Sequence, residues 1–182
     1  TVSRQCVFPG SQPLGSGHKI MKRLALFVDV QNIYYTVKDS YGCHFNYREL
    51  WRQLSREADI TLAHAYAIDR NNSQQQGFQQ ILRDIGFDIK LKPYIQRADG
   101  SAKGDWDVGI TIDMLTAAAN KLEPIDCAVL LSGDGDFDLL LQHISRDQGV
   151  DTVVYGVPAL SATSLVDAAT EFRPIEGSLL LK

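Results

Sequence analysis

The sequence lacks the features that would place the chain in a membrane or in a disulfide-stabilised fold. No apolar run approaches the roughly 18 residues that a membrane-spanning helix needs, and there is no signal-peptide pattern. The three cysteines are an odd number without CxxC spacing, which disfavours a disulfide framework and a zinc site. We therefore expect a cytoplasmic protein that makes no membrane contact.

The chain also lacks an excess of basic residues. Its 18 Lys and Arg residues against 22 Asp and Glu residues give a net charge of −4, which disfavours a nucleic-acid coat protein. An enzyme that acts on nucleic acid through metal ions is not excluded, because bound cations would reverse the local field of an acidic site. The hydrophobic content of 45% and the length of 182 residues are typical of one globular domain with a buried core.

Residues 1–20 differ from the rest of the chain. They are rich in Gly, Ser, Pro and Gln and show no periodicity, so we expect a disordered leader or an added extension. Met21 is then the expected natural start, and residues 21–182 are expected to form a single domain.

Short apolar runs alternate with helical patterns from residue 24 onward. Strands are predicted over 24–28, 60–68, 87–94, 127–131 and 152–155. Helices are predicted near 33–38, 47–56, 73–85, 107–120, 137–146 and 161–169, followed by a short tail. Asn46 and Ser73 are the expected N-caps, with Glu49 completing a capping box. The alternation predicts parallel βαβ units and hence an α/β fold, a Rossmann-like three-layer α/β/α sandwich with a central, mostly parallel sheet.

The segment 128–138 carries the strongest functional signal. Four apolar residues run into Asp134, Asp136 and Asp138 at alternate positions. The apolar run is typical of a strand buried on both faces, and the turn after it lies where open α/β sheets build their ligand sites. Three carboxylates so close together repel one another unless a positive charge lies among them. This pattern predicts a divalent metal site.

Two further aspartates can reach the same edge of the sheet. Asp29 ends the strand over 24–28, and Asp107 begins a helix after the polar loop over 96–104. Mg²⁺ and Mn²⁺ prefer oxygen ligands and suit phosphodiester hydrolysis. We therefore predict Asp29, Asp107, Asp134 and Asp136 as catalytic metal ligands. Asp29 and Asp134 in particular follow apolar strands and are not expected to serve as helix caps.

The remaining aspartates near this edge are expected to have supporting roles. Asp138 is expected to cap its helix or to be solvated. Asp113 lies six residues after Asp107, about 120° further round the helix, so both side chains cannot face the metal squarely. Asp105 and Asp107 compete for the same helix cap, so one of the two is expected to be structural.

Other acidic and glycine-rich motifs fit poorly. An EF-hand loop would need glycine and glutamate where Leu139 and Ser145 stand. The turn lacks the third glycine of a dinucleotide fingerprint. Gln31 occupies the place of the second aspartate of haloacid-dehalogenase-like phosphatases. A receiver-like domain would need a lysine after the strand over 152–155, and none is there.

Three sequence segments together resemble the NYN domain family, and within it the LabA-like branch of the PIN-like nuclease superfamily. They are Phe27–Asn32, the run from Lys103-Gly104 through Asp107-Val108 to Asp113-Met114, and Leu131–Phe137. The resemblance covers residues 22 to about 172. It implies a PIN-like fold and a ribonuclease site in which clustered aspartates hold Mg²⁺ or Mn²⁺.

Carried over by position, the resemblance implies roles for individual residues. Asp29 would be the first-strand ligand, Asn32 would orient it or the metal waters, and Ser132 would support the turn. Two residues separate Gly104 from Asp107 where many relatives have one, which leaves open whether Asp105 or Asp107 points inward. Val108 and the spacing to Asp113 favour Asp107.

Basic and aromatic residues before Asp107 could contact a substrate. Lys103 and Arg97 are the predicted substrate-binding residues, since basic side chains among aromatics can hold phosphates and stack bases. A solvated loop explains the same residues equally well. The predicted function is a metal-dependent ribonuclease acting on single-stranded or structured RNA. The alternative is a non-catalytic RNA- or protein-binding regulatory module, and homodimerisation is left open.

Overall fold

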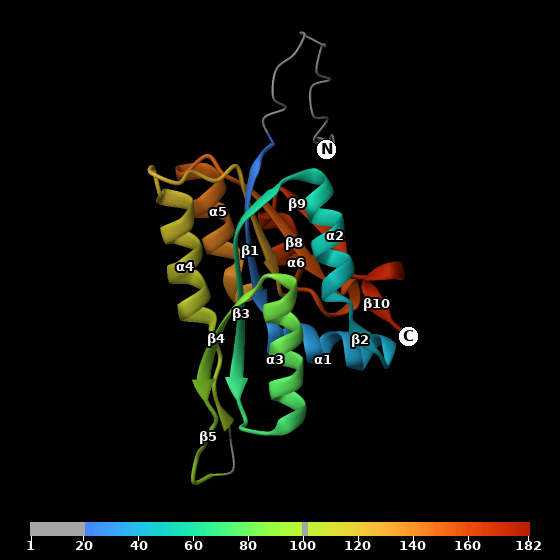
Figure 1. Cartoon of the computed structure of the whole chain (residues 1–182). Helices are drawn as coiled ribbons and strands as arrows, with labels where there is room; N and C mark the ends of the chain where they lie inside the picture. The colour runs from blue at the N-terminus through green and yellow to red at the C-terminus, as the bar shows by residue number, and fades with distance from the viewer. Residues whose placement is uncertain (1–20, 100–101) are drawn as a thin grey trace.

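Six parallel strands form the centre of the fold (Figure 1). The computed structural model describes residues 21–99 and 102–182, so the predicted leader over 1–20 lies outside the described residues. The strand order is β4-β3-β1-β7-β8-β9. The strands are β1 (Arg23–Asp29), β3 (Asp59–Asp69), β4 (Asp88–Pro93), β7 (Cys127–Leu131), β8 (Asp151–Gly156) and β9 (Glu171–Pro174).

Helices cover both faces of this sheet. One face carries α1 (Val30–Tyr41), α2 (Tyr47–Glu57) and α3 (Ser73–Ile85), and the other carries α4 (Asp107–Ala119), α5 (Asp138–Asp147) and α6 (Thr163–Ala168). Alternate residues of β1 face opposite layers: Leu26 and Val28 belong to the first core, and Phe27 belongs to the second. The predicted three-layer α/β/α sandwich is therefore confirmed.

The structure confirms two of the predicted helix-end signals and contradicts two others. Asn46 caps α2 by accepting from the Glu49 N–H at 3.1 Å, and Gly86 (φ +133°) ends α3. The reciprocal half of the predicted capping box is wrong, because the Asn46 N–H donates to the Leu179 carbonyl. The cap of α3 is Asn72, not Ser73: its side chain accepts from the Gln75 N–H at 2.8 Å.

Replacing Asn46 by alanine is expected to lower the free energy of unfolding by about 1 kcal/mol, because the cap hydrogen bond of α2 is lost. Urea denaturation measures the change. Asn46→Ser is the matched control, since its hydroxyl can cap the helix and should retain most of the stability. Equal losses in the two variants would contradict the capping role.

Short elements near the chain's loops escaped the sequence analysis. The polar loop contains a small hairpin of β5 (Ile95–Gln96) and β6 (Ala102–Lys103), and β2 (His44–Phe45) pairs with β10 (Leu180–Leu181). The predicted tail contains β9, the edge strand of the sheet. Three 3₁₀ turns were also missed: η1 (Gly135–Phe137), η2 (Pro158–Leu160) and η3 (Gly177–Leu179). Pairs this short have no periodicity that a sequence pattern can reveal.

The sheet order brings the acidic turn beside the end of β1. β1 and β7 are neighbours with Val28 opposite Leu131, so Asp29 and the turn after Leu131 leave the sheet at the same edge. In Figure 1 the strands run downward, and this carboxyl edge is at the lower end, where α1 and the β5 hairpin also lie. The predicted metal site required the strands that precede Asp29 and Asp134 to be neighbours, and β1 and β7 are neighbours.

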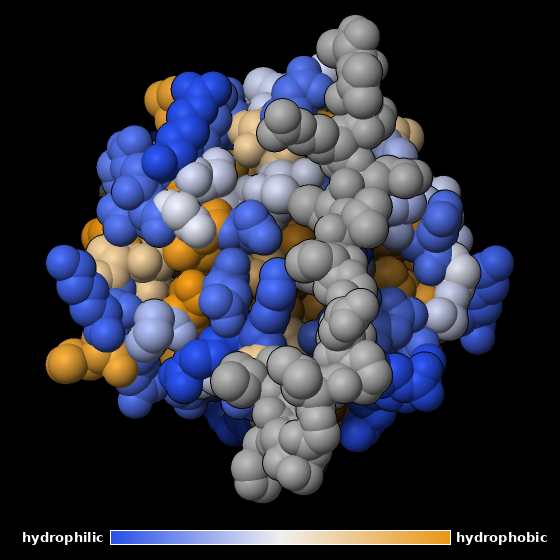
Figure 2. All heavy atoms as spheres, turned by 90° about the horizontal axis from the view of Figure 1, so that it is seen from above, coloured by the Kyte–Doolittle hydropathy of each residue, from blue (hydrophilic) through white to orange (hydrophobic). Residues whose placement is uncertain are grey.

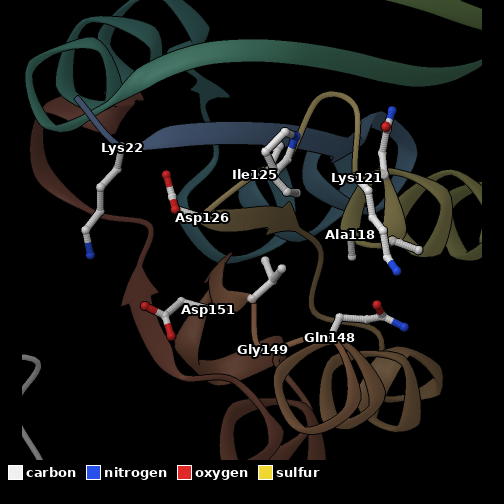
Figure 3. Close-up of a pocket in the computed structure, with 12 residues that line it drawn as sticks. Lys22, Ala118, Lys121, Ile125, Asp126, Gln148, Gly149 and Asp151 are labelled. Atoms are coloured by element: carbon white, nitrogen blue, oxygen red, sulfur yellow. The ribbon is translucent and has the colours of Figure 1, made fainter. Parts of the chain in front are cut away.

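The amino edge of the sheet has a different character. Figure 2 looks onto it, and hydrophilic side chains dominate the described surface there. A hollow of about 390 Å³ at this edge is lined by residues that include Lys22, Asp126 and Asp151 (Figure 3). The Asp126 carboxylate accepts from the Arg23 N–H at 2.8 Å, which ties β1 to the start of β7. This hollow lies at the opposite end of the sheet from the acidic turn. Among the described residues, no helix combines the length and apolar character needed to cross a membrane.

Candidate metal centre

Asp29 joins the end of β1 to the start of α1. Its side chain is only 8% exposed, and its carboxylate accepts from the Asn32 N–H at 3.3 Å. The Ser132 hydroxyl also hydrogen-bonds this carboxylate. The expectation that Asp29 caps nothing was wrong, because α1 begins directly at Val30 and its first N–H groups need an acceptor.

The turn after β7 is held by a set of short polar contacts. The Ser132 hydroxyl accepts from the Asp134 N–H at 3.2 Å, and the Asn32 side-chain oxygen accepts from the Gly133 N–H at 2.9 Å. A Cβ on Gly133 would lie 2.7 Å from the Leu160 carbonyl oxygen, so the turn requires glycine there. Asp134 accepts from the Asp136 N–H at 2.9 Å. Asp134 therefore caps η1, contrary to expectation. Ser132 and Asn32 each accept a hydrogen bond from a backbone N–H of the turn. The implied role of Asn32 in orienting Asp29 or the metal waters stays a prediction.

Asn32→Ala is expected to loosen this turn, because the buried Gly133 N–H would lose its acceptor. An unsatisfied buried donor costs about 1–3 kcal/mol, so the free energy of unfolding in EDTA should fall by that amount. Chemical denaturation measures the loss. Affinity for Mn²⁺, measured by calorimetry, should fall by about 10–100-fold as the turn loses its orientation. Unchanged stability and unchanged affinity would contradict this account of the turn.

The start of α4 resolves the competition between Asp105 and Asp107. The Asp105 carboxylate accepts from the Asp107 N–H at 3.1 Å and is exposed. This leaves the Asp107 carboxylate to point toward the turn after β7, where one of its oxygens lies within 4.8 Å of an Asp134 carboxylate oxygen. Asp107 is therefore the residue of this pair that joins the acidic edge.

Three carboxylates from two parts of the chain meet at this edge. Carboxylate oxygens of Asp107, Asp134 and Asp136 all lie within 4.8 Å of one another. Asp29 lies beside this group without belonging to it, close enough for its charge to act on Asp107. The structure thus gathers three of the four predicted ligands and places the fourth next to them. We refer to Asp107, Asp134 and Asp136 as the acidic cluster.

The electrostatics of the edge favour a cation. Burial, and then the charges of Asp134 and Asp105, raise the pKa of Asp29 from 3.8 to about 6. Burial, and then the charges of Asp134, Asp105 and Asp29, raise the pKa of Asp107 to about 7. In the described part of the chain, no ion pair neutralises Asp29 or any member of the acidic cluster. An all-oxygen donor set under mutual repulsion fits a hard divalent ion such as Mg²⁺ or Mn²⁺.

Asp113 belongs to a separate network that joins α4 to β3 and β4. Its carboxylate accepts from the Lys90 ammonium at 2.6 Å and from the Tyr66 hydroxyl at 2.7 Å. Burial opposes ionisation of Asp113, but these two hydrogen bonds outweigh it and hold its pKa below the usual value. The Trp106 ring packs on Tyr66, and its indole N–H donates to the Ala67 carbonyl at 2.9 Å. This network fixes the start of α4 and so supports the position of the Asp107 backbone.

The other predicted residues do not join the acidic cluster. Asp138 begins α5 and accepts from the Leu139 N–H at 2.6 Å, which fits a helix-start role. Arg97 is exposed in the loop between β5 and β6. The Lys103 backbone lies in β6, and its side chain is outside the described residues. Lys92 lies over the Trp106 ring at 4.4 Å and donates to the Asp105 carbonyl, so it helps to hold the α4 start.

The fold and the acidic edge together define a class of protein with a three-layer α/β/α fold and a cluster of aspartates that could bind metal. Comparison with known proteins gives the family. The NYN domain family matches residues 23–176, and the chain belongs to it. The predicted resemblance is thereby confirmed.

Two relatives illustrate this membership. The chain is 30% identical to the low amplitude and bright protein LabA of Synechococcus elongatus over 140 residues. This aligned region covers 72% of this chain and 73% of LabA. It is also similar to a protein of unknown function from Vibrio parahaemolyticus. Its crystal structure matches with a TM-score of 0.83 and 44% identity, over 91% of this chain and 100% of that chain.

Proposed function

We propose that this protein is a divalent-cation-dependent ribonuclease. The observation that carries the proposal is the convergence of the Asp107, Asp134 and Asp136 carboxylates within 4.8 Å at the carboxyl edge of the sheet. Membership of the NYN domain family supports it. A module that only binds RNA would gain nothing from carboxylates that repel the phosphate backbone.

The residues of the edge have separate tasks in this proposal. Asp107, Asp134 and Asp136 would hold Mg²⁺ or Mn²⁺, and Asp29 would add negative charge behind them. When bound, the ion supplies Lewis-acid activation of water and offsets the charge that develops on the phosphate. Ser132 and Asn32 keep the turn in place, since each accepts a hydrogen bond from a backbone N–H of the turn.

Cleavage of labelled single-stranded RNA at pH 7.5 tests the proposal. We expect cleavage with Mn²⁺ or Mg²⁺ and none in excess EDTA. Asp39→Asn is the control for the loss of one negative charge outside the acidic cluster. Asp39 is an exposed aspartate on α1, so this variant should cleave RNA like the unmodified chain. RNA binding without cleavage under all these conditions would contradict the proposal and support the non-catalytic module.

A further inference from the structure

A groove of about 910 Å³ lies on the α1 and α3 side of the sheet. We call it the aromatic groove. Its walls come from α1, β2, the start of α2, the end of β3 and α3, elements that lie together near the carboxyl edge in Figure 1. Its lining includes Tyr34, Tyr35, Tyr47, Arg48, Ile68 and Arg70.

The charge of the aromatic groove is opposite to that of the acidic cluster. None of the lining residues is Asp or Glu, although the chain contains 22 of them. Arg48 and Arg70 both line the groove and are exposed. An acid-free groove with two arginines suits a polyanion, in a chain whose net charge would otherwise repel one.

Two tyrosine side chains are partly exposed along this groove, and the Tyr34 ring is stacked on His44. Tyr34 is 41% exposed and Tyr35 is 49% exposed, and their rings meet edge to face at 5.3 Å. The Arg70 guanidinium lies 3.4 Å from the Tyr35 hydroxyl and 5.1 Å from the centre of the Tyr94 ring. Exposed rings beside arginines are the combination that binds single-stranded nucleic acid, with bases on the rings and phosphates on the guanidinium groups.

The groove begins next to the acidic edge. Its lining residues Val30 and Gln31 directly follow Asp29 in the chain. The lining residue Tyr47 is close enough to Asp29 for the carboxylate charge to help raise the tyrosine pKa, after burial. Ile68, on another wall, packs against Gly104, where a Cβ would lie 2.9 Å from the Ile68 side chain. The groove and the acidic edge therefore meet at the end of β1, where Asp29 ends the strand and Val30 begins the groove lining.

We propose that the aromatic groove binds the bases and phosphates of single-stranded RNA on one side of the scissile phosphate. Tyr35 stacks a base, and Arg70 and Arg48 face phosphates. This inference rests on the proposed ribonuclease function, because the groove is assigned RNA on the ground that the acidic edge beside it is proposed to cleave RNA. Duplex RNA is disfavoured as the occupant, since its bases are already stacked on one another and cannot reach the rings.

Fluorescence anisotropy with a labelled single-stranded RNA tests the groove separately from cleavage. The parent protein is the full chain carrying Asp134→Asn, in Mg²⁺, so that binding is measured without turnover. Tyr35→Ala and Arg70→Ala are each expected to raise the Kd by about tenfold. Arg70→Ala should also lower the slope of log Kd against log salt by about 0.7. Thermal unfolding verifies that each variant is folded.

Two controls separate stacking and local charge from general effects. Tyr35→Phe keeps the ring and should bind within about twofold of the parent. Arg146→Ala removes an exposed charge from α5, on the opposite layer, and should leave the Kd unchanged. A duplex of the same sequence should compete poorly.

Each result decides between the two proposals. Weaker binding by the groove variants supports the groove, even if the unmodified chain does not cleave RNA. Cleavage by the unmodified chain, with all groove variants binding like the parent, overturns the groove and leaves the ribonuclease standing. The inference also fails if the parent binds no RNA. It fails equally if Tyr35→Ala splits a dimer in sedimentation without changing RNA affinity, because the groove would then join two copies of the chain.

Discussion

Asp134→Asn is expected to reduce RNA cleavage by about 10³-fold or more, because it removes one negative charge from the acidic cluster and leaves the fold intact. Asparagine keeps the side-chain oxygen that accepts from the Asp136 N–H, so η1 retains its cap. The contact between the Ser132 hydroxyl and the Asp134 N–H involves only the backbone of residue 134 and also persists. The change therefore separates cation binding from turn structure.

Initial rates of RNA cleavage with saturating Mn²⁺ measure this effect. Asp107→Asn should behave similarly, since Asp107 contributes a carboxylate to the same cluster from a different helix. Asp39→Asn provides the control for loss of one negative charge elsewhere on the chain. If both Asp134→Asn and Asp107→Asn retain full activity, the acidic cluster takes no part in catalysis.

In the absence of divalent cations, the protein is expected to lose stability as the pH rises from about 4 to about 7. Asp29 has a pKa of about 6 in the folded chain against 3.8 ordinarily, so over this range the folded state binds more protons than the unfolded state. The folded pKa is raised, so the contribution is fully present below the unfolded value and is lost as the pH passes the folded value. A shift of about two pKa units corresponds to about 3 kcal/mol. Asp107, with a pKa of about 7, acts in the same direction at slightly higher pH.

Urea denaturation in EDTA at pH 5 and pH 8 measures this loss. His64 opposes it, because burial and then the Lys90 charge lower its pKa and make acid pH unfavourable for it. Asp29→Asn isolates the Asp29 contribution: this variant should be the more stable protein at pH 8 in EDTA, and its pH dependence should be flatter. Mn²⁺ should stabilise the unmodified chain at pH 8 through binding to the folded state. Identical pH dependence with and without Asp29 would contradict the assignment.

The sequence predicted the sheet and the acidic edge because both depend on local patterns. The apolar run before Asp134 and the one before Asp29 could only be buried strands, and the carboxyl ends of parallel strands share an edge. The cap made by Asp29 was missed because β1 turns directly into α1 and leaves no loop residue to act as cap. The cap made by Asp134 was missed because η1 is only three residues long and has no periodicity of its own. Asp29 can accept a backbone N–H and still lie beside the acidic cluster.

The aromatic groove could not have been predicted in the same way. Its lining residues come from segments as far apart as Tyr35, Arg70 and Leu181, and only the packing of α1, α3 and β2 brings them together. In the sequence alone, Tyr34 and Tyr35 look like residues of an ordinary exposed helix face. The stretch 70–76 looks like an ordinary loop followed by a helix cap. The useful signal was the lack of Asp and Glu among the lining residues, and it becomes visible only once these residues are neighbours.

We propose that Asp107, Asp134 and Asp136 hold one divalent cation beside Asp29, and anomalous diffraction from crystals soaked in Mn²⁺ tests this site. We expect an anomalous peak among these three carboxylates, at about 2.1 Å from at least one Asp134 oxygen, which is lost in Asp134→Asn crystals. Ordered carboxylates with no peak among them, or a peak that persists in Asp134→Asn, would contradict it.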